Sequence, residues 1–334
     1  MKSVSVLGAG AWGTAISQLA AFAGYEVRIW AYEKEVIDSI NKDHENKIYL
    51  PGFVLDKKIR AFQDINQVVA ASQLVFNVVP VQFIRNVWKK VNPELVNRDK
   101  YIINASKGIE QNTLCLVSEI FESLFPGIIN NFLVLSGPSF AEEVVKKVPT
   151  SVSLAAGNIE LAARISKLFH IPQFRLYKTD DLIGVQLGGA LKNVMAIASG
   201  AVDGLGLGLN TRAAMITRGL SEMARLGIAL GASPETFSGL SGMGDLILTC
   251  TGNLSRNYTA GYRLGQGETI QEILESTNSV AEGVTTVKSV QALAQRHNID
   301  MPITEAVYKG IYEDLSPKNA IRSILARNLK SDGI

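Results

Sequence analysis

One lysine in the sequence has surroundings that suit acid–base chemistry. Lys192 lies within GGALKNVMA (residues 188–196), where the other residues except Asn193 are apolar or glycine. On a helix its closest same-face neighbours stand three and four positions away, and none can pair with an ammonium group: Gly188, Gly189, Met195 and Ala196. Burial would depress the pKa of such a lysine toward neutrality, as a general acid and base requires. We predict Lys192 as the catalytic residue; a solvated lysine on a helix surface is the alternative.

An acid and an arginine further along the chain could complete the same site. The stretch LSGMGDLILTCT (residues 240–251) holds one carboxylate, Asp245, in an otherwise apolar helix, and a buried carboxylate without a partner is costly. Lys192 or a ligand hydroxyl would satisfy it; the alternative is an aspartate that only fixes its own helical turn. Ser255, Arg256 and Asn257 precede another helix, where backbone N–H groups and a guanidinium would bind an anion. A serine cap beside a solvated arginine is the competing interpretation.

Three glycines near the start of the chain have the spacing of a dinucleotide-binding turn. Gly8, Gly10 and Gly13 form Gly-x-Gly-x-x-Gly between a β-branched run (residues 4–7) and a helical segment (residues 15–23). In such a turn the first glycine allows a tight bend, the second lets a pyrophosphate approach the backbone, and the third lets helix and strand pack closely. A second strand at residues 26–30 supplies the expected context. The alternative is an ordinary glycine-rich turn between a strand and a helix.

The residues after the second strand leave the choice between NAD and NADP open. An NAD site usually places an acid for the ribose about 20 residues beyond the glycines. Here Ala31-Tyr32-Glu33 follows the strand, so no aspartate stands there and the glutamate comes late. Arg28 or Lys34 could approach a 2′-phosphate. We therefore predict that both nucleotides bind and that NADPH is preferred.

Two further turns of the first half follow strands. Residues 101–105 are predicted as a buried strand that ends at Ser106-Lys107-Gly108, which would bring Lys107 to the carboxyl end of the sheet, where ligands of such sheets bind. Residues 132–135 lead into Gly137-Pro138-Ser139, a second glycine turn whose backbone could meet a substrate or the nicotinamide. Ser139 could cap the helix that follows. For Lys107 a surface position is the alternative.

These segments predict an α/β protein: an N-terminal Rossmann-like, doubly wound parallel sheet followed by an all-α C-terminal domain. Strands alternate with helical crossovers as far as residue 180, and no convincing strand follows. We therefore divide the chain into a dinucleotide-binding domain (1–180) and a helical substrate-binding domain (181–334), with the substrate between them. The predicted helices of the second domain span roughly residues 182–201, 211–230, 255–265, 283–297, 302–314 and 317–327.

Composition limits the partners and the compartment. The chain has 334 residues, 47% of them hydrophobic, and a net charge of +2, so nothing favours nucleic acid as a partner or stable membrane insertion. Cys115 and Cys250 show no spacing typical of a disulfide or a metal site. None of the histidines is expected in a site either, so no metal is predicted: His44, His170 and His297. We do not expect the uncharged segment 3–25 to be a leader, because its glycines have nucleotide-loop spacing. A cytoplasmic protein is expected.

Taken together, the motifs resemble the bacterial type of NAD(P)-dependent glycerol-3-phosphate dehydrogenase. The resemblance runs in order over nearly the whole chain and includes the lysine–asparagine helix and the later Ser-Arg-Asn, which are specific to that family. The residues that carry it are GAGAWGTA (8–15), SKG (106–108), GPSFAEE (137–143), GALKN (189–193), GMGDL (242–246) and SRN (255–257).

This resemblance implies reversible reduction of dihydroxyacetone phosphate to sn-glycerol 3-phosphate, for phospholipid synthesis. It makes Lys192 the proton donor and acceptor at the C2 oxygen. It implies that the phosphorylated substrate is held by Lys107, Gly137, Ser139, Lys192, Asp245, Ser255, Arg256 and Asn257. Besides the three glycines, it implies cofactor contacts from Ala11, Trp12, Tyr32, Lys107, Ala141, Arg256, Val280 and Glu282.

Two other classes of protein share some of these features. A 3-hydroxyacid dehydrogenase can also combine a Rossmann half, a helical half and a catalytic lysine, but the anion site at Arg256 favours a phosphorylated substrate. A nucleotide-binding redox sensor without activity would have no reason to place Lys192 in an apolar cleft. A homodimer is expected by family analogy alone, and feedback regulation and kinetic constants are left open.

Overall fold

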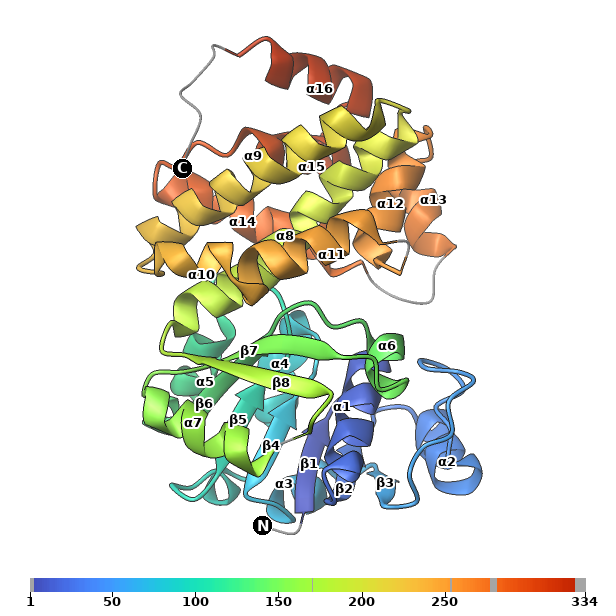
Figure 1. Cartoon of the computed structure of the whole chain (residues 1–334), viewed down its shortest axis with the longest axis vertical. Helices are drawn as coiled ribbons and strands as arrows, with labels where there is room; N and C mark the ends of the chain where they lie inside the picture. Colours follow the sequence, from blue (N-terminus) through green and yellow to red (C-terminus); the bar gives the residue numbers. More distant parts are fainter. Residues whose placement is uncertain (1–2, 170, 253, 277–280, 328–334) are drawn as a thin grey trace. The chain divides into compact units, whose positions relative to one another are not determined.

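The computed structural model describes residues 3–169, 171–252, 254–276 and 281–327, which form two compact units (Figure 1). The first unit comprises Met1–Ser106 and Val117–Leu182, and the second comprises Lys107–Leu116 and Ile183–Ile334. We expected Lys107 within the first half of the chain. Instead, the ten-residue segment that it begins groups with the helical unit.

The first unit is built on one eight-stranded sheet with the strand order β3-β2-β1-β4-β5-β6-β7-β8. The order of its first six strands is that of a Rossmann fold, with a topological switch between β1 and β4. The strands are β1 (Ser3–Leu7), β2 (Glu26–Trp30), β3 (Ile59–Phe62), β4 (Leu74–Asn77), β5 (Tyr101–Asn104), β6 (Phe132–Ser136), β7 (Thr150–Ala156) and β8 (Phe174–Thr179).

The prediction of an all-parallel sheet is wrong at one step. β7 runs antiparallel to β6, with Ser136 opposite Ser153, while the other neighbouring strands are parallel. The connection from β6 to β7 contains a single short helix, α6 (Ala141–Val145). That helix packs on α1 (Ala11–Phe22). A parallel return needs a crossover that spans the sheet, and this connection provides none, so the chain reverses direction.

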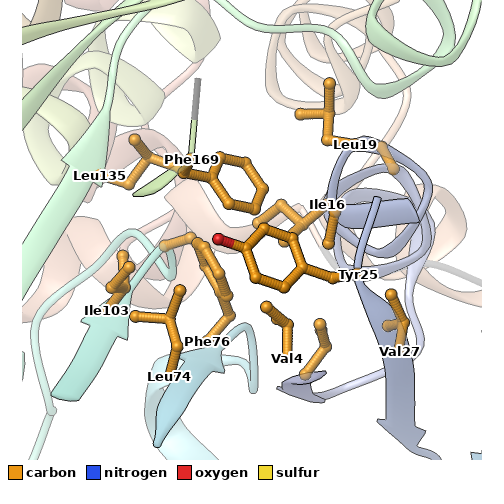
Figure 2. Close-up of a cluster of buried hydrophobic side chains, with 14 of the residues drawn as sticks. Val4, Ile16, Leu19, Tyr25, Val27, Leu74, Phe76, Ile103, Leu135 and Phe169 are labelled. Carbon is orange, nitrogen blue, oxygen red and sulfur yellow. The ribbon is translucent and has the colours of Figure 1, made fainter. Parts of the chain in front are cut away.

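Alternate strand residues face opposite sides of the sheet, and helices cover both sides. On one side Val4, Val6 and Phe76 join side chains of α1 and α7 in a single core cluster. Figure 2 shows part of this cluster, in which the Tyr25 ring stacks on Phe169 at 6.3 Å between centroids. The remaining helical segments of the unit are α2 (Lys34–Asp43), α3 (Ile65–Ala70), α4 (Val81–Trp88), η1 (Pro93–Leu95), α5 (Val117–Leu124), η2 (Ile128–Asn131) and α7 (Ile159–Leu168).

The other side of the sheet is covered by α3, α4 and α5. The Ser5 hydroxyl donates a hydrogen bond to the Val68 carbonyl of α3 at 2.6 Å. The Phe121 ring of α5 packs against Phe132 of β6 at 5.2 Å and against Trp88 of α4 at 4.7 Å. With both faces buried, the carboxyl ends of the strands are where the sheet can present polar groups to a ligand.

The second unit is helical in its described residues, apart from turns and loops, as the sequence predicts. Its longest helix, α8, is long and apolar enough to span a membrane, but 83% of its most apolar window is buried inside the protein, as in a core helix. The helices are α8 (Leu182–Gly204), α9 (Gly208–Ala229), α10 (Pro234–Ser238), the π-helical turn η3 (Leu240–Gly244), α11 (Asp245–Thr251), α12 (Arg256–Gly265), α13 (Ile270–Glu275), α14 (Glu282–Arg296), α15 (Pro302–Tyr312) and α16 (Pro317–Leu325).

Two of these helices were not predicted. α10 and α13 contain five and six residues, which is too short for an apolar period to be recognised in the sequence. The predicted longer helices are present, with ends that differ by a few residues. The prediction of an all-helical second half is therefore confirmed for the described part of the chain.

Candidate functional site

The glycine turn after β1 has the geometry that the motif predicts. Gly8 has a φ of +106°, and a Cβ there would lie 2.7 Å from the Val78 carbonyl oxygen at the end of β4. A Cβ at Gly13 would lie 1.8 Å from the Gly8 carbonyl oxygen. A Cβ at Gly10, by contrast, would meet no atom of the described chain within 4 Å. Two glycines thus serve close packing, and Gly10 leaves open space beside the backbone.

This open space lies at the start of α1, which begins with Ala11 and Trp12. Its N-cap residue, Gly10, offers no side chain to the first N–H groups. A buried asparagine stiffens the turn, because Asn46 Nδ2 donates to the Ala9 carbonyl and to Thr14 Oγ1, both at 2.8 Å. Uncapped N–H groups at the start of a three-turn helix, beside a glycine at the β1/β4 switch, fit the pyrophosphate of a dinucleotide.

The residues after β2 lie at the surface beside a second loop. Tyr32 is 73% exposed. Glu33 is the N-cap residue of α2, and Tyr49 Oη donates a hydrogen bond to Glu33 Oε1 at 3.0 Å. The Arg28 guanidinium lies over the Phe62 ring at 5.4 Å. The Glu33 carboxylate, which comes later in the chain than the usual ribose-binding acid, is therefore held by a tyrosine.

The glycine of the second turn is also required by a close backbone contact. Gly137 has a φ of +150°, and a Cβ there would lie 2.9 Å from the Val152 Cα of the antiparallel strand β7. The prediction that Ser139 caps the next helix is wrong: the N-cap residue of α6 is Phe140, and Ser139 Oγ donates to the Gly137 carbonyl at 2.9 Å. The reversal at β6–β7, which sequence analysis missed, is what shapes this turn. Ala141 is the first residue of α6.

In the second unit, Lys192 has a partner from another helix. Its Nζ lies 2.5 Å from Asp245 Oδ1, and Lys107 Nζ lies 2.7 Å from Asp245 Oδ2. Lys192 Nζ also donates to Thr249 Oγ1 at 2.9 Å, and Thr249 Oγ1 donates to the Asp245 carbonyl at 2.6 Å. The carboxylate is 1% exposed. Of the alternatives left open for Asp245, the pairing with Lys192 is the one found.

The electrostatics of this cluster favour proton transfer. Burial lowers the pKa of Lys192 to about 8. Asp245 opposes this shift, and the nearby Lys107 ammonium adds to it. With this pKa the lysine can release a proton as the ammonium and accept one as the neutral amine near neutral pH. Two lysines and one aspartate leave the cluster with one net positive charge.

Glycines bring the helices around the cluster into backbone contact. A Cβ at Gly188, one turn before Lys192, would lie 2.4 Å from the Ser241 carbonyl oxygen in the turn that precedes Asp245. A Cβ at Gly200 would lie 2.0 Å from the Tyr258 carbonyl oxygen of α12. Gly188 and Gly200 therefore allow the turn η3 and the helix α12 to approach the α8 backbone closely, and Asp245 follows η3 directly.

The predicted anion site begins α12. Ser255 is its N-cap residue, and its Oγ accepts from the Tyr258 N–H at 3.2 Å, so the capping interpretation is confirmed for this serine. Arg256 is exposed. Asn257 is buried, and its Oδ1 accepts from the Gly283 N–H at 2.8 Å. α12 is thereby fastened to the start of α14.

Glu282 is the first residue of α14. Burial raises the pKa of its carboxyl group, against the opposing charges of Arg256, Lys107 and Lys192. The charges of Arg256, Lys107 and Lys192 therefore all act on the Glu282 carboxyl group. The predicted cofactor contact Val280 lies outside the described residues, as does His170, which is not expected in a site.

Thr249 also belongs to this site, although no role was predicted for it from the sequence. Its position was a usable signal, because it stands four residues after Asp245 and so on the same face of α11. Its hydroxyl connects the lysine ammonium to the helix backbone. It therefore belongs to the same hydrogen-bonded cluster.

A Rossmann unit with a dinucleotide turn, joined to a helical unit with a buried lysine–aspartate pair, defines a two-unit nicotinamide-dependent dehydrogenase. Comparison with known proteins identifies the family. The model of the NAD-dependent glycerol-3-phosphate dehydrogenase N-terminus matches residues 3–162, and that of the C-terminus matches residues 181–322. The chain belongs to this family and is an oxidoreductase that uses NAD or NADP.

Individual members of this family are similar to the chain over nearly their whole length. A protein of Leptospira biflexa named glycerol-3-phosphate dehydrogenase [NAD(P)+] is 48% identical over 99% of both chains. A protein of the same name from Citrifermentans bemidjiense is 46% identical, covering 100% of this chain and 99% of the other. The crystal structure of glycerol-3-phosphate dehydrogenase from Coxiella burnetii has a TM-score of 0.91 at 38% identity, over 98% of this chain and 99% of that one.

Substitutions at two glycines of the turn should affect cofactor binding and protein stability separately. We expect Gly10→Ala to keep the thermal stability of the protein but to weaken NADPH binding about tenfold or more, because the methyl group would fill the space left for the pyrophosphate. Gly13→Ala should instead lower the melting temperature, because its Cβ would overlap the Gly8 carbonyl. Thermal unfolding and a fluorescence titration with NADPH measure the two effects.

Gly157→Ala is the matched control, because a Cβ there makes only an ordinary contact with Leu182 at 3.6 Å. It should behave as wild type in both measurements. NADPH binding by Gly10→Ala that equals wild type would contradict the proposed place of the pyrophosphate.

Proposed function

We propose that the protein catalyses the reversible NAD(P)-dependent reduction of dihydroxyacetone phosphate to sn-glycerol 3-phosphate, with Lys192 as acid and base. The observation that carries this proposal is the Lys192–Asp245–Lys107 cluster in a member of the glycerol-3-phosphate dehydrogenase family. The product is the backbone of glycerophospholipids, so we assign the enzyme to phospholipid synthesis. The alternative of a 3-hydroxyacid dehydrogenase is not favoured, because both halves of the chain match the glycerol-3-phosphate family.

In the direction of reduction, Lys192 donates a proton to the C2 oxygen of the substrate. When bound, NAD(P)H supplies the hydride that goes to the C2 carbon. The negative charge that develops on the oxygen is stabilised by the Lys192 ammonium before and during proton transfer. Asp245 orients that ammonium, and Thr249 accepts a second hydrogen bond from it, so its third proton can point at the substrate. In the reverse direction neutral Lys192 takes the proton from the C2 hydroxyl.

The phosphate of the substrate is assigned to the start of α12. The backbone N–H groups there and the Arg256 guanidinium suit a dianion. Asn257 Oδ1 is occupied by the Gly283 N–H, which fixes its amide so that the NH₂ end can donate to a ligand. Further substrate contacts are assigned to Lys107, Gly137, Ser139, Lys192, Asp245 and Ser255.

The cofactor is assigned chiefly to the first unit. The turn of Gly8, Gly10 and Gly13 and the uncapped start of α1 support this assignment through their open space and N–H groups. The other cofactor contacts that we propose are Ala11, Trp12, Tyr32, Lys107, Ala141, Arg256, Val280 and Glu282. We also propose a cytoplasmic homodimer, which gel filtration with light scattering would test.

The role of Lys192 is tested by comparing two variants at saturating cofactor. Lys192→Ala should lose on the order of 10²–10⁴ in kcat, because one positioned acid and base is removed. Arg256→Ala should mainly raise KM for dihydroxyacetone phosphate, because a phosphate clamp acts alike on substrate and transition state. Steady-state kinetics of both variants check this, with NADPH binding and thermal unfolding to confirm intact protein. A Lys192→Ala enzyme that keeps more than about a tenth of wild-type kcat would refute the assignment.

The cofactor preference is tested by initial rates with NADH and NADPH side by side. We expect both to support turnover and NADPH to be preferred, because Glu33 is exposed and held by Tyr49, and Arg28 and Lys34 stand nearby in the sequence. A preference for NADH above about a hundredfold in kcat/KM would contradict this expectation. That ratio corresponds to roughly 2.7 kcal/mol, the scale of a dedicated ribose contact.

A further inference from the structure

The segment Lys107–Leu116, here called the strap, is fastened to the helical unit although it connects two elements of the first unit. It leaves the end of β5 and returns to the start of α5, yet it groups with the second unit. Its first residue is the lysine that pairs with Asp245. Whatever holds the strap therefore also sets the position of the Lys107 ammonium.

The strap is a compact loop rather than a loose connection. The Leu114 N–H donates to the Glu110 carbonyl at 2.9 Å, and the Glu110 N–H donates to the Cys115 carbonyl at 3.1 Å. Leu114 itself has a φ of +61°, which a residue with a side chain adopts only when its surroundings require it. Ile109 and Leu116 are buried in the core of the second unit. The loop is therefore held together by its own backbone hydrogen bonds and by the burial of Ile109 and Leu116.

One face of α14 holds this loop by two hydrogen bonds. Ser289 Oγ donates to the Ile109 carbonyl at 3.2 Å, and Gln111 Nε2 donates to the Thr285 carbonyl at 3.2 Å. Thr285 and Ser289 are four residues apart, so these bonds lie one helical turn from each other. The Ser289 side chain is almost completely buried, at 1% exposed.

The hydrogen bond of Ser289 is unusual for a serine within a helix. Such a hydroxyl commonly bonds to the carbonyl four residues earlier in its own helix. Ser221 of α9 does this, donating to the Thr217 carbonyl at 3.2 Å. For Ser289 the corresponding carbonyl is that of Thr285, which accepts the Gln111 amide instead. The serine hydroxyl reaches the strap backbone, two residues from Lys107.

We propose that Ser289 and Gln111 are positioning residues that fasten the strap to α14 and thereby hold the Lys107 ammonium against Asp245 during the reaction. Gly108, with a φ of +144°, turns the chain between Lys107 and Ile109. Holding the Ile109 backbone in place therefore also limits where the Lys107 backbone can lie. A displacement of about 1 Å would break the 2.7 Å contact with Asp245, and misplacement on that scale reduces catalysis. The proposal rests on the proposed function of the Lys107–Asp245–Lys192 cluster.

The test compares Ser289→Ala, Gln111→Leu and the combined variant with Ser221→Ala as the matched control. Ser289→Ala removes the bond to the Ile109 carbonyl, and Gln111→Leu removes the bond to the Thr285 carbonyl. The control removes a buried helical serine that is remote in sequence from the strap and the cluster. We expect Ser289→Ala and Gln111→Leu each to lower kcat/KM for dihydroxyacetone phosphate about 3–10-fold, as for loss of one hydrogen bond, and the combined variant to lose more. Ser221→Ala should stay within about twofold of wild type.

A mutant cycle separates positioning of Lys107 from general destabilisation. In a Lys107→Met background Ser289→Ala should have no further effect on kcat/KM, because the group that it positions is gone. An undiminished effect in that background, or a Ser289→Ala enzyme no different from Ser221→Ala, would overturn the proposal. The proposed function fails separately, if the wild-type enzyme does not turn over dihydroxyacetone phosphate or Lys192→Ala remains active.

Discussion

A carboxylate held between two ammonium groups is the interaction on which the functional site depends. Asp245 is buried, and an unpaired buried charge would cost several kcal/mol. Lys192 and Lys107 each take one of its oxygens, so the loss of either lysine still leaves the carboxylate paired. The cluster keeps one positive charge in a poorly solvated place, where it acts strongly on an anionic substrate and a developing alkoxide. The helix packing, the glycines of α8 and the strap all serve to hold these three side chains together.

Much of the fold follows from local sequence patterns. The β-branched run, the three glycines and the following helix define β1, the turn and α1. Gly8 and Gly13 are required by close backbone contacts, and Gly10 leaves open space at the start of the helix. The long helices of the second unit follow from apolar stretches at helical spacing. The reversal at β7 could not be predicted, because α6 has only five residues and its packing on α1 is a contact between distant segments. Whether a strand runs parallel or antiparallel to its neighbour depends on such packing, which cannot be predicted from a local sequence pattern.

Most of the individual residues of the cluster were predicted from the sequence, but few of the contacts between them were. The apolar surroundings of Lys192 and the isolated Asp245 indicated two groups that each needed a partner, and the structure pairs them across helices. The grouping of Lys107 with the helical unit was not foreseen, because the strand before it belongs to the sheet. The hydrogen bond that fastens the neighbouring Ile109 carbonyl to Ser289 spans 180 residues. Thr249 was visible by its spacing from Asp245 but was not assigned. Which of these residues contact one another depends on how distant segments pack, and the sequence does not show that packing.

The pH dependence of kcat/KM in both directions tests the central claim most directly, because it reports the protonation state of the free enzyme. Burial and the neighbouring Lys107 lower the pKa of Lys192 to about 8. Reduction of dihydroxyacetone phosphate needs the protonated lysine, so its kcat/KM should be level below about pH 8 and fall above it. Oxidation of sn-glycerol 3-phosphate needs the neutral lysine and should rise with pH to a plateau above the same value. Two profiles that move in the same direction, or that show no inflection between about pH 7 and 9.5, would contradict the account.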